Sequence, residues 1–300
     1  MENIIFYIVD VFAEEKYQGN QLAVFRDAGG LSDAGMQRIA RETNFAETAF
    51  ILSDDKVDNG YAVKIFTPDF EVPFAGHPTL GTAYIIREEI EKGLSGTINL
   101  NLGVGQIPVA SEGDGLWMKQ KSPLFGRRVD AGDMSEILGI GDGNIDAAFP
   151  VQEVSTGLPS VIVPLDSLKS VSQCRINHEK YKKFLEESFS ANILVFSRET
   201  YKEENNINVR VFCEDSGFAE DAATGSANGN LAGYLLEYGY FGASRLEYRV
   251  EQGYEIGRKS LLKIRAAKTG GMFDINVGGK VFPVAKGEWF IHAEDRKCSK

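Results

Sequence analysis

The feature that most constrains this 300-residue chain is a segment that occurs twice, once in each half. Residues 63–86 ("VKIFTPDFEVPFAGHPTLGTAYII") and 209–235 ("VRVFCEDSGFAEDAATGSANGNLAGYL") both have the pattern of a strand, a loop, a glycine with a polar residue, and a helix. With Gly76 aligned to Gly225, the second loop is three residues longer, and the helices match in these pairs: His77 with Ser226, Thr79 with Asn228, and Ala83 with Ala232. We therefore predict an internal duplication that gives two similar domains.

Strand-like and helix-like segments alternate along both halves, which indicates an α/β (α+β) fold. In the first half we expect a helix capped by Ser32 and another from about Pro78 to Glu91. A turn-like, basic stretch at Lys121–Arg128 suggests the boundary between the copies. We expect domains at residues 1–122 and 123–285, with the C-terminal strand 286–300 able to join the first domain.

Charge and cysteine content limit the classes of partner. The net charge of -11 disfavours nonspecific binding to nucleic acid or to an anionic membrane, and no apolar run has the length of a membrane helix. The N-terminus lacks the pattern of a secretory signal, so we expect a cytoplasmic protein. The three cysteines lie far apart without a CxxC motif, and we interpret them as free thiols: Cys174, Cys213 and Cys298.

The start of each repeated helix is a candidate anion site. A helix N-terminus exposes unpaired N–H groups and a partial positive charge, and small residues let a ligand approach the backbone. The segments "AGHPTLGT" and "AATGSANG" supply glycine, hydroxyl groups and short side chains at this point. The alternative is that Thr79, Thr224 and Ser226 are ordinary helix caps. Two matching loops in one chain favour a carboxylate or phosphate held by both.

Three residues beside these loops are candidates for proton transfer. Glu47 lies between a helix and an apolar strand, where apolar neighbours would suit a general base; the alternative is a solvated glutamate. Asp221 is either a capping carboxylate or an acid that orients the substrate, and His77 is either a donor to substrate or a loop histidine. The residues alone leave these alternatives open.

Other motifs give no support for a cofactor or a metal. No GxGxxG follows a strand, "GYEIGRKS" fails the spacing of a phosphate loop, and "TGSANG" is not a nucleophile elbow. His178 and His292 have no partners at the spacing of metal ligands. We therefore expect neither cofactor nor metal.

At these residues the sequence resembles the PhzF-like family of phenazine biosynthesis, which has the diaminopimelate-epimerase-like fold. The matching stretches are "VDVFAEEKYQGNQLAVF", "ETNFAETAFIL", "FTPDFEVPFAGHPTLGTA", "AEDAATGSANGNLAGYL" and "EQGYEIGRKS", in family order. The resemblance implies two similar domains, each a curved mixed sheet or open barrel around a central helix. It also implies a homodimer with an active site in the cleft between the domains.

The resemblance further implies a cofactor-independent isomerase that moves a proton between carbons of a small carboxylate-bearing metabolite, similar to dihydrohydroxyanthranilate. Glu47 matches the catalytic glutamate of the family, and His77 and Asp221 match residues that orient and polarise the substrate. The positions that match the donors to the substrate carboxylate are Gly76, Gly225 and Ser226.

Related epimerases use two cysteines, one at each loop–helix junction. Neither junction here contains cysteine, so a two-cysteine epimerase is excluded by the sequence. Three loop prolines of the family pattern are replaced here, by Gln21, Ala222 and Lys259, which leaves the identity of the substrate open.

Two other classes of function compete with the isomerase. A non-catalytic metabolite-binding protein could use the same helix N-termini, and it would be stabilised by ligand without exchanging protons. A hydrolase with Ser226 as nucleophile would react with a serine-directed phosphonate.

Overall fold

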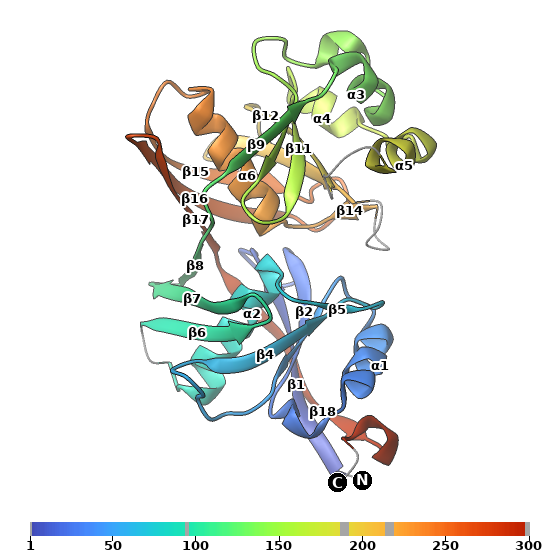
Figure 1. Cartoon of the computed structure of the whole chain (residues 1–300), viewed down its shortest axis with the longest axis vertical. Helices are drawn as coiled ribbons and strands as arrows, with labels where there is room; N and C mark the ends of the chain where they lie inside the picture. The colour runs from blue at the N-terminus through green and yellow to red at the C-terminus, as the bar shows by residue number, and fades with distance from the viewer. Residues whose placement is uncertain (1, 94–95, 187–191, 214–218, 298–300) are drawn as a thin grey trace. The chain divides into compact units, whose positions relative to one another are not determined.

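The computed structural model describes residues 2–93, 96–186, 192–213 and 219–297, and it divides the chain into two compact units (Figure 1). Unit 1 comprises Met1–Met118 and Gly279–Lys300, and unit 2 comprises Lys119–Gly278. The C-terminal segment thus returns to the unit that contains the N-terminus. None of the described helices is long and apolar enough to cross a membrane.

Unit 1 is a mixed sheet in the order β18-β1-β2-β3-β4-β6-β7-β8, with the short β5 paired to the end of β4. The pairs β2–β3 and β4–β6 are parallel, and the other pairs are antiparallel. The strands are β1 (Glu2–Val11), β2 (Asn20–Phe25), β3 (Thr48–Ile51), β4 (Tyr61–Phe66), β5 (Glu71–Val72), β6 (Thr97–Leu102), β7 (Gly105–Glu112), β8 (Gly115–Lys119) and β18 (Val281–Ile291). The helices are α1 (Asp33–Thr43), α2 (Gly76–Ile85), the π-helical turn η2 (Ile86–Ile90) and the 3-10 turns η1 (Ala28–Gly30) and η4 (Ala293–Asp295).

Unit 2 is a mixed sheet in the order β9-β10-β11-β12-β13-β15-β16-β17, with β14 paired to the end of β13. Here β11–β12 and β13–β15 are the parallel pairs. The strands are β9 (Leu124–Arg128), β10 (Gln152–Ser155), β11 (Pro159–Pro164), β12 (Asn192–Ser197), β13 (Ile207–Phe212), β14 (Glu220–Asp221), β15 (Arg245–Gln252), β16 (Ser260–Thr269) and β17 (Met272–Gly279). The helices are α3 (Ala131–Leu138), α4 (Leu168–Gln173), α5 (His178–Glu186), α6 (Gly225–Glu237) and the 3-10 turn η3 (Asp142–Asn144).

The two sheets have the same pattern of parallel and antiparallel pairs, and their strands follow in the same order except at one edge, where β18 comes from the end of the chain and β9 directly precedes β10. The predicted duplication is therefore confirmed. The strand registers fix the alignment: Phe66 pairs with Glu71 in unit 1, as Phe212 pairs with Glu220 in unit 2. Four residues separate the first pair along the chain and seven separate the second, which accounts for the loop predicted to be three residues longer. The spacing from β5 to α2 equals that from β14 to α6, so Gly76 and Gly225 are equivalent as predicted.

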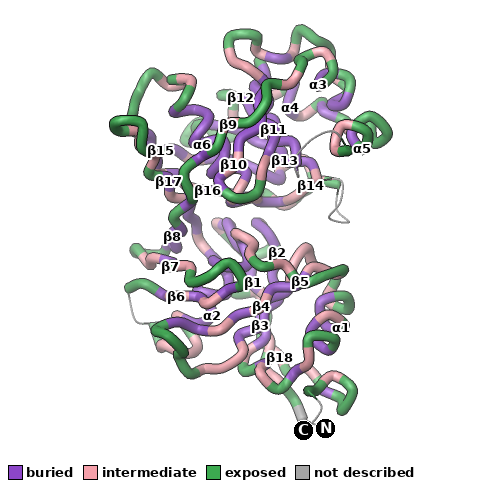
Figure 2. Tube along the Cα trace, viewed as in Figure 1, coloured by how far each residue is buried: buried purple, intermediate pink, exposed green. Residues whose placement is uncertain are grey.

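The equivalent helices α2 and α6 are buried on nearly all sides, unlike the amphipathic α1. Strands pack around α2 (β1, β2, β3 and β6 among them) and around α6 (β10, β11, β12 and β16), which makes each helix the centre of its unit (Figure 2). Small residues allow this packing: a Cβ added at Gly81 would lie 2.5 Å from the Leu22 side chain, and one at Gly233 would lie 2.7 Å from Pro123.

Two local predictions need correction. Leu124–Arg128, expected to be turn-like, forms strand β9, because it pairs with β10 and Arg127 forms an ion pair with Glu153. The helix expected to reach Glu91 is α-helical only to Ile85 and continues as a π-helical turn. The cap at Ser32 is confirmed, since its hydroxyl accepts a hydrogen bond from the N–H of Gly35 at 3.0 Å.

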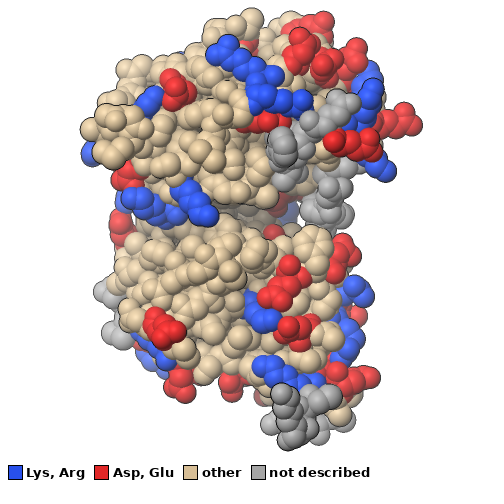
Figure 3. Space-filling view, in the orientation of Figure 1, with Lys and Arg blue, Asp and Glu red and all other residues tan. Residues whose placement is uncertain are grey.

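Charged side chains of both signs are interspersed on the face of each unit that Figure 3 shows. Each unit also contains ion pairs between charged side chains, such as Lys286 with Glu89 in unit 1 and Lys268 with Glu237 in unit 2. On the surface drawn there, the acidic side chains lie in several places and do not form a single patch.

Candidate active site

Glu47 and His77 lie together in unit 1. The Nε2 atom of His77 is 3.5 Å from the Oε2 atom of Glu47, and the side chains are 5% and 20% exposed, respectively. A carboxylate beside an imidazole, both largely removed from water, is an arrangement that can exchange protons with a bound molecule. The structure thus brings together two of the residues that the sequence singled out.

The turn before β3 fixes the position of Glu47. Helix α1 ends at Thr43, and the next residue, Asn44, adopts the left-handed conformation with φ of 53°. The hydroxyls of Thr43 and Thr48, on either side of this turn, are 2.8 Å apart, and Thr43 also donates to α1 carbonyls. Glu47 therefore lies in a turn whose two ends are joined by a hydrogen bond between Thr43 and Thr48.

Helix α2 begins at Gly76 without a side-chain cap. Its N-cap residue, Ala75, has no side-chain donor or acceptor, and Pro78 has no N–H. Thr79 does not cap the helix, because its hydroxyl donates to the carbonyl of Ala75 at 2.7 Å. Among the described residues, no group accepts a hydrogen bond from the Gly76 N–H. His77 therefore lies at a helix start whose positive end is open.

Helix α6 has the equivalent start in unit 2. Its N-cap, Thr224, donates its hydroxyl hydrogen to Oδ2 of Asp221 at 2.5 Å and makes no cap hydrogen bond. Asn228, the equivalent of Thr79, donates to the carbonyl of Thr224 at 3.0 Å, as Thr79 does to Ala75. Asp221, Gly225 and Ser226 lie within one short segment of unit 2, from β14 to the first turn of α6.

A buried glutamine that the sequence analysis missed connects this segment to the sheet. The Gln252 side chain is fully buried at the end of β15, and its amide bonds to Asp221, Thr224 and Asn228. The equivalent position in unit 1 is Leu102, so comparing the two copies gave no signal for a polar residue here.

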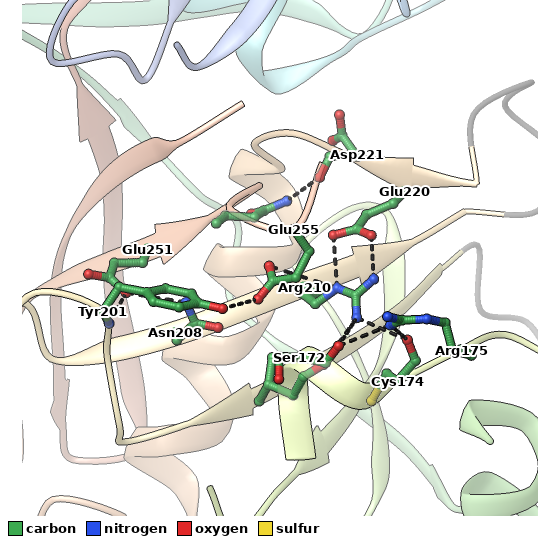
Figure 4. A network of polar contacts seen from close by, with 12 residues as sticks. Ser172, Cys174, Arg175, Tyr201, Asn208, Arg210, Glu220, Asp221, Glu251 and Glu255 are labelled. Atoms are coloured by element: carbon green, nitrogen blue, oxygen red, sulfur yellow. Dashed lines mark hydrogen bonds and ion pairs between the residues drawn. The ribbon is translucent and has the colours of Figure 1, made fainter. Parts of the chain in front are cut away.

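An ion pair on β13 holds the strand that contains Asp221. Arg210 donates two hydrogen bonds to Glu220, at 3.0 and 2.6 Å, and others to the carbonyls of Val171 and Cys174 at the end of α4 (Figure 4). Although burial alone would lower it, the hydrogen bonds and charge of Glu220 raise the pKa of Arg210.

The equivalent pair in unit 1 is Lys64 with Glu71, at 3.2 Å. That pair is 27% and 42% exposed, whereas Arg210 and Glu220 are 6% and 7% exposed. A basic residue and a glutamate at matching positions of both copies are visible in the sequence and could have predicted this contact.

The described cysteines form no disulfide. Cys174 and Cys213 are free thiols, as predicted, and Cys298 lies outside the described residues. Burial raises the pKa of the Cys174 thiol to about 12, which makes it a poor nucleophile.

Comparison with protein families matches residues 9–287 to a family described as "Phenazine biosynthesis-like protein". An uncharacterized isomerase of Pasteurella multocida is 32% identical in an alignment of 298 residues that covers 98% of this chain and 97% of that protein. A trans-2,3-dihydro-3-hydroxyanthranilate isomerase of Pseudomonas aeruginosa is also 32% identical, over 95% of this chain and 99% of that enzyme.

Solved structures agree with these relatives. The crystal structure of a PhzF family protein of Bacillus anthracis superposes with a TM-score of 0.89 at 28% identity, covering 97% of this chain and 100% of that one. A hydroxyproline epimerase of Agrobacterium vitis superposes with a TM-score of 0.63 at 9% identity, covering 95% of this chain and 92% of that one. The second likeness concerns the fold alone, and it agrees with the predicted diaminopimelate-epimerase-like architecture.

Proposed function

Because the chain belongs to the phenazine biosynthesis-like protein family and is therefore an isomerase, we propose that it moves a proton between two carbons of a small carboxylate-bearing metabolite. Glu47 is the acid/base in this proposal. The observation that carries it is the 3.5 Å distance between Glu47 and His77 beside an uncapped helix start. Three Pseudomonas relatives are named as trans-2,3-dihydro-3-hydroxyanthranilate isomerases, which makes that compound the model substrate.

In the proposed reaction the Glu47 carboxylate accepts a proton from a carbon of the substrate. The electron pair of that C–H bond forms a new double bond and leaves an anionic, enol-like intermediate. The Glu47 carboxylic acid then returns the proton to a second carbon, where electrons of an existing double bond form the new C–H bond. His77 donates a hydrogen bond to the charge that develops on the intermediate, which lowers the barrier to both transfers.

The substrate carboxylate is the group that the open helix starts suit. The proposed donors to this carboxylate are the N–H groups of Gly76 and Gly225 and the hydroxyl of Ser226. These residues are small, so an anion can approach the donors closely. Asp221 orients the substrate by accepting hydrogen bonds from its hydroxyl or amino groups. All of these steps use side chains and backbone groups of this chain, so we propose catalysis that is independent of a cofactor.

The test is isomerisation of trans-2,3-dihydro-3-hydroxyanthranilate in deuterium oxide, followed by NMR and mass spectrometry. The wild-type protein is expected to form product that carries solvent deuterium on carbon, and Glu47→Gln is expected to lose both product and label. Glu42→Gln, on the exposed side of α1, is the matched control and should behave as wild type. Thermal stabilisation by the compound without any label would indicate a binding protein, and label uptake by Glu47→Gln would exclude Glu47 as the acid/base.

A further inference from the structure

Four hydrogen bonds join the Gln252 side chain to the segment that begins α6. Its Oε1 accepts from the N–H of Thr224 at 3.1 Å and from Nδ2 of Asn228 at 2.9 Å. Its Nε2 donates to the carbonyl of Asp221 at 3.0 Å and to the hydroxyl of Thr224 at 3.0 Å. A backbone N–H on one side and a backbone carbonyl on the other allow only this orientation of the amide.

These contacts change what Thr224 does at the helix start. A threonine at an N-cap normally turns its oxygen toward the second or third N–H of the helix and accepts a hydrogen bond there. Here the Thr224 oxygen accepts from Gln252 instead, and its hydrogen is directed to Asp221. Among the described residues, no group accepts a hydrogen bond from the N–H groups of the first turn, at Gly225, Ser226 and Ala227.

Unit 1 reaches the same result with different residues. The position equivalent to Thr224 is Ala75, which has no oxygen that could cap α2. The position equivalent to Gln252 is Leu102, and the position equivalent to Asp221 is Val72. Both helix starts are therefore open, one because a capping side chain is missing and the other because that side chain is held elsewhere.

We infer that Gln252 is a positioning residue that prevents Thr224 from capping α6, and so leaves the first-turn N–H groups available to a ligand. The same hydrogen bonds fix the Asp221 carboxylate through the Thr224 hydroxyl. That the ligand is the carboxylate of the substrate rests on the proposed function. The effect on the cap does not, since it is a property of the protein alone.

The experiment measures hydrogen exchange of the backbone amides of α6 by NMR in the full chain without ligand. In Gln252→Leu, which copies the residue of unit 1, Thr224 is released and caps the helix. The amide of Ser226 or Ala227 should then exchange about fivefold more slowly, the size expected for a typical N-cap hydrogen bond. In the double variant Gln252→Leu with Thr224→Val this protection should disappear.

Two further variants separate this effect from a loss of packing. Gln152 is also buried in unit 2, but it bonds to Tyr238 at the other end of α6, so Gln152→Leu should leave the first-turn amides unchanged. Thr224→Val alone should also leave their exchange unchanged, because Thr224 does not cap the helix in the wild type. Faster exchange in Thr224→Val would overturn the inference even if Gln252→Leu failed to fold, and so would unchanged exchange in a folded Gln252→Leu.

Kinetics then connect the inference to the proposed function. With the dihydro compound as substrate, Gln252→Leu should raise KM severalfold through weaker carboxylate binding, and the double variant should recover part of that loss. A change in amide exchange without any isomerase activity in the wild type would leave the role of Gln252 intact and reject the proposed function. Isomerase activity in the wild type, together with unchanged amide exchange in a folded Gln252→Leu, would support the proposed function and reject the role of Gln252.

Discussion

Asn192 occupies in unit 2 the position that Glu47 occupies in unit 1. Each directly precedes a strand residue that pairs with the equivalent phenylalanine, Thr48 with Phe66 in β3–β4 and Ile193 with Phe212 in β12–β13. The duplication therefore places a titratable carboxyl group at one of the two positions and an amide at the other. The equivalent helix starts differ similarly: unit 1 has the imidazole of His77, and unit 2 has the hydroxyl of Ser226.

This asymmetry predicts that a single group both removes and returns the proton. With a substrate deuterated at the donor carbon, in ordinary water, the product should retain a measurable fraction of the deuterium at the acceptor carbon, because Glu47 holds it between the two transfers. Glu47→Gln should lower kcat/KM by about 10²–10⁴-fold, the usual contribution of general acid/base catalysis. Mass spectrometry of the product measures the retention, and complete washout at every conversion would speak for two separate groups or for a base open to water.

The two equivalent ion pairs should contribute very differently to stability. Arg210→Met leaves the buried Glu220 carboxylate without its partner, and this should lower the free energy of unfolding by about 3–5 kcal/mol. Lys64→Met breaks the pair with Glu71 and a second pair with Asp33, both partly exposed to water, and should cost less than about 1 kcal/mol. Urea unfolding of both variants gives the comparison, and equal losses would show that burial is not what distinguishes the pairs.

The repeat explains how much of the fold and the site could be predicted. Aligning Gly76 with Gly225 was enough to anticipate equal units and a three-residue difference in loop length, because hydrophobic patterns and glycines determine both. Gln252 could not be found in this way, since its partners lie 24 to 31 residues away and its counterpart is a leucine. Its role depends on the pairing of β13 with β15, and such long-range pairing is not encoded in any local pattern.

Two buried tyrosines of unit 2 offer a matched test of hydrogen bonding in the core. The hydroxyl of Tyr248 has no hydrogen-bond partner among the described residues, and burial raises the pKa of this side chain. Tyr248→Phe removes a polar group that is buried without compensation, so it should leave stability unchanged or raise it by about 1–2 kcal/mol. Tyr234 donates to the carbonyl of Pro150 at 2.8 Å, so Tyr234→Phe should cost about 1 kcal/mol. The midpoint of thermal unfolding should therefore fall in Tyr234→Phe and stay unchanged or rise in Tyr248→Phe, and a fall in both would mean that Tyr248 finds a partner in solution.

The folded protein should lose stability as the pH rises from about 10 to about 12. Burial raises the pKa of Tyr61, Tyr201 and Tyr254 to about 12, helped by the charge or hydrogen bond of a nearby glutamate in each case. A phenol in the unfolded chain titrates near pH 10, so between about pH 10 and pH 12 the unfolded state releases protons that the folded state retains. The stability that these groups contribute is thus complete below pH 10 and falls as the pH rises toward 12.

Urea unfolding at pH 8, 10 and 11.5 measures this loss, and absorbance at 295 nm reports the phenolates that form on unfolding. Replacing the three residues together by phenylalanine removes the titrating groups, so the variant should lose less stability than the wild type between pH 8 and pH 11.5. An equal loss in both proteins would assign the alkaline instability to the growing negative charge of this acidic chain. Lysines lose their protons in this pH range, and the repulsion among carboxylates that they no longer offset acts on both proteins alike.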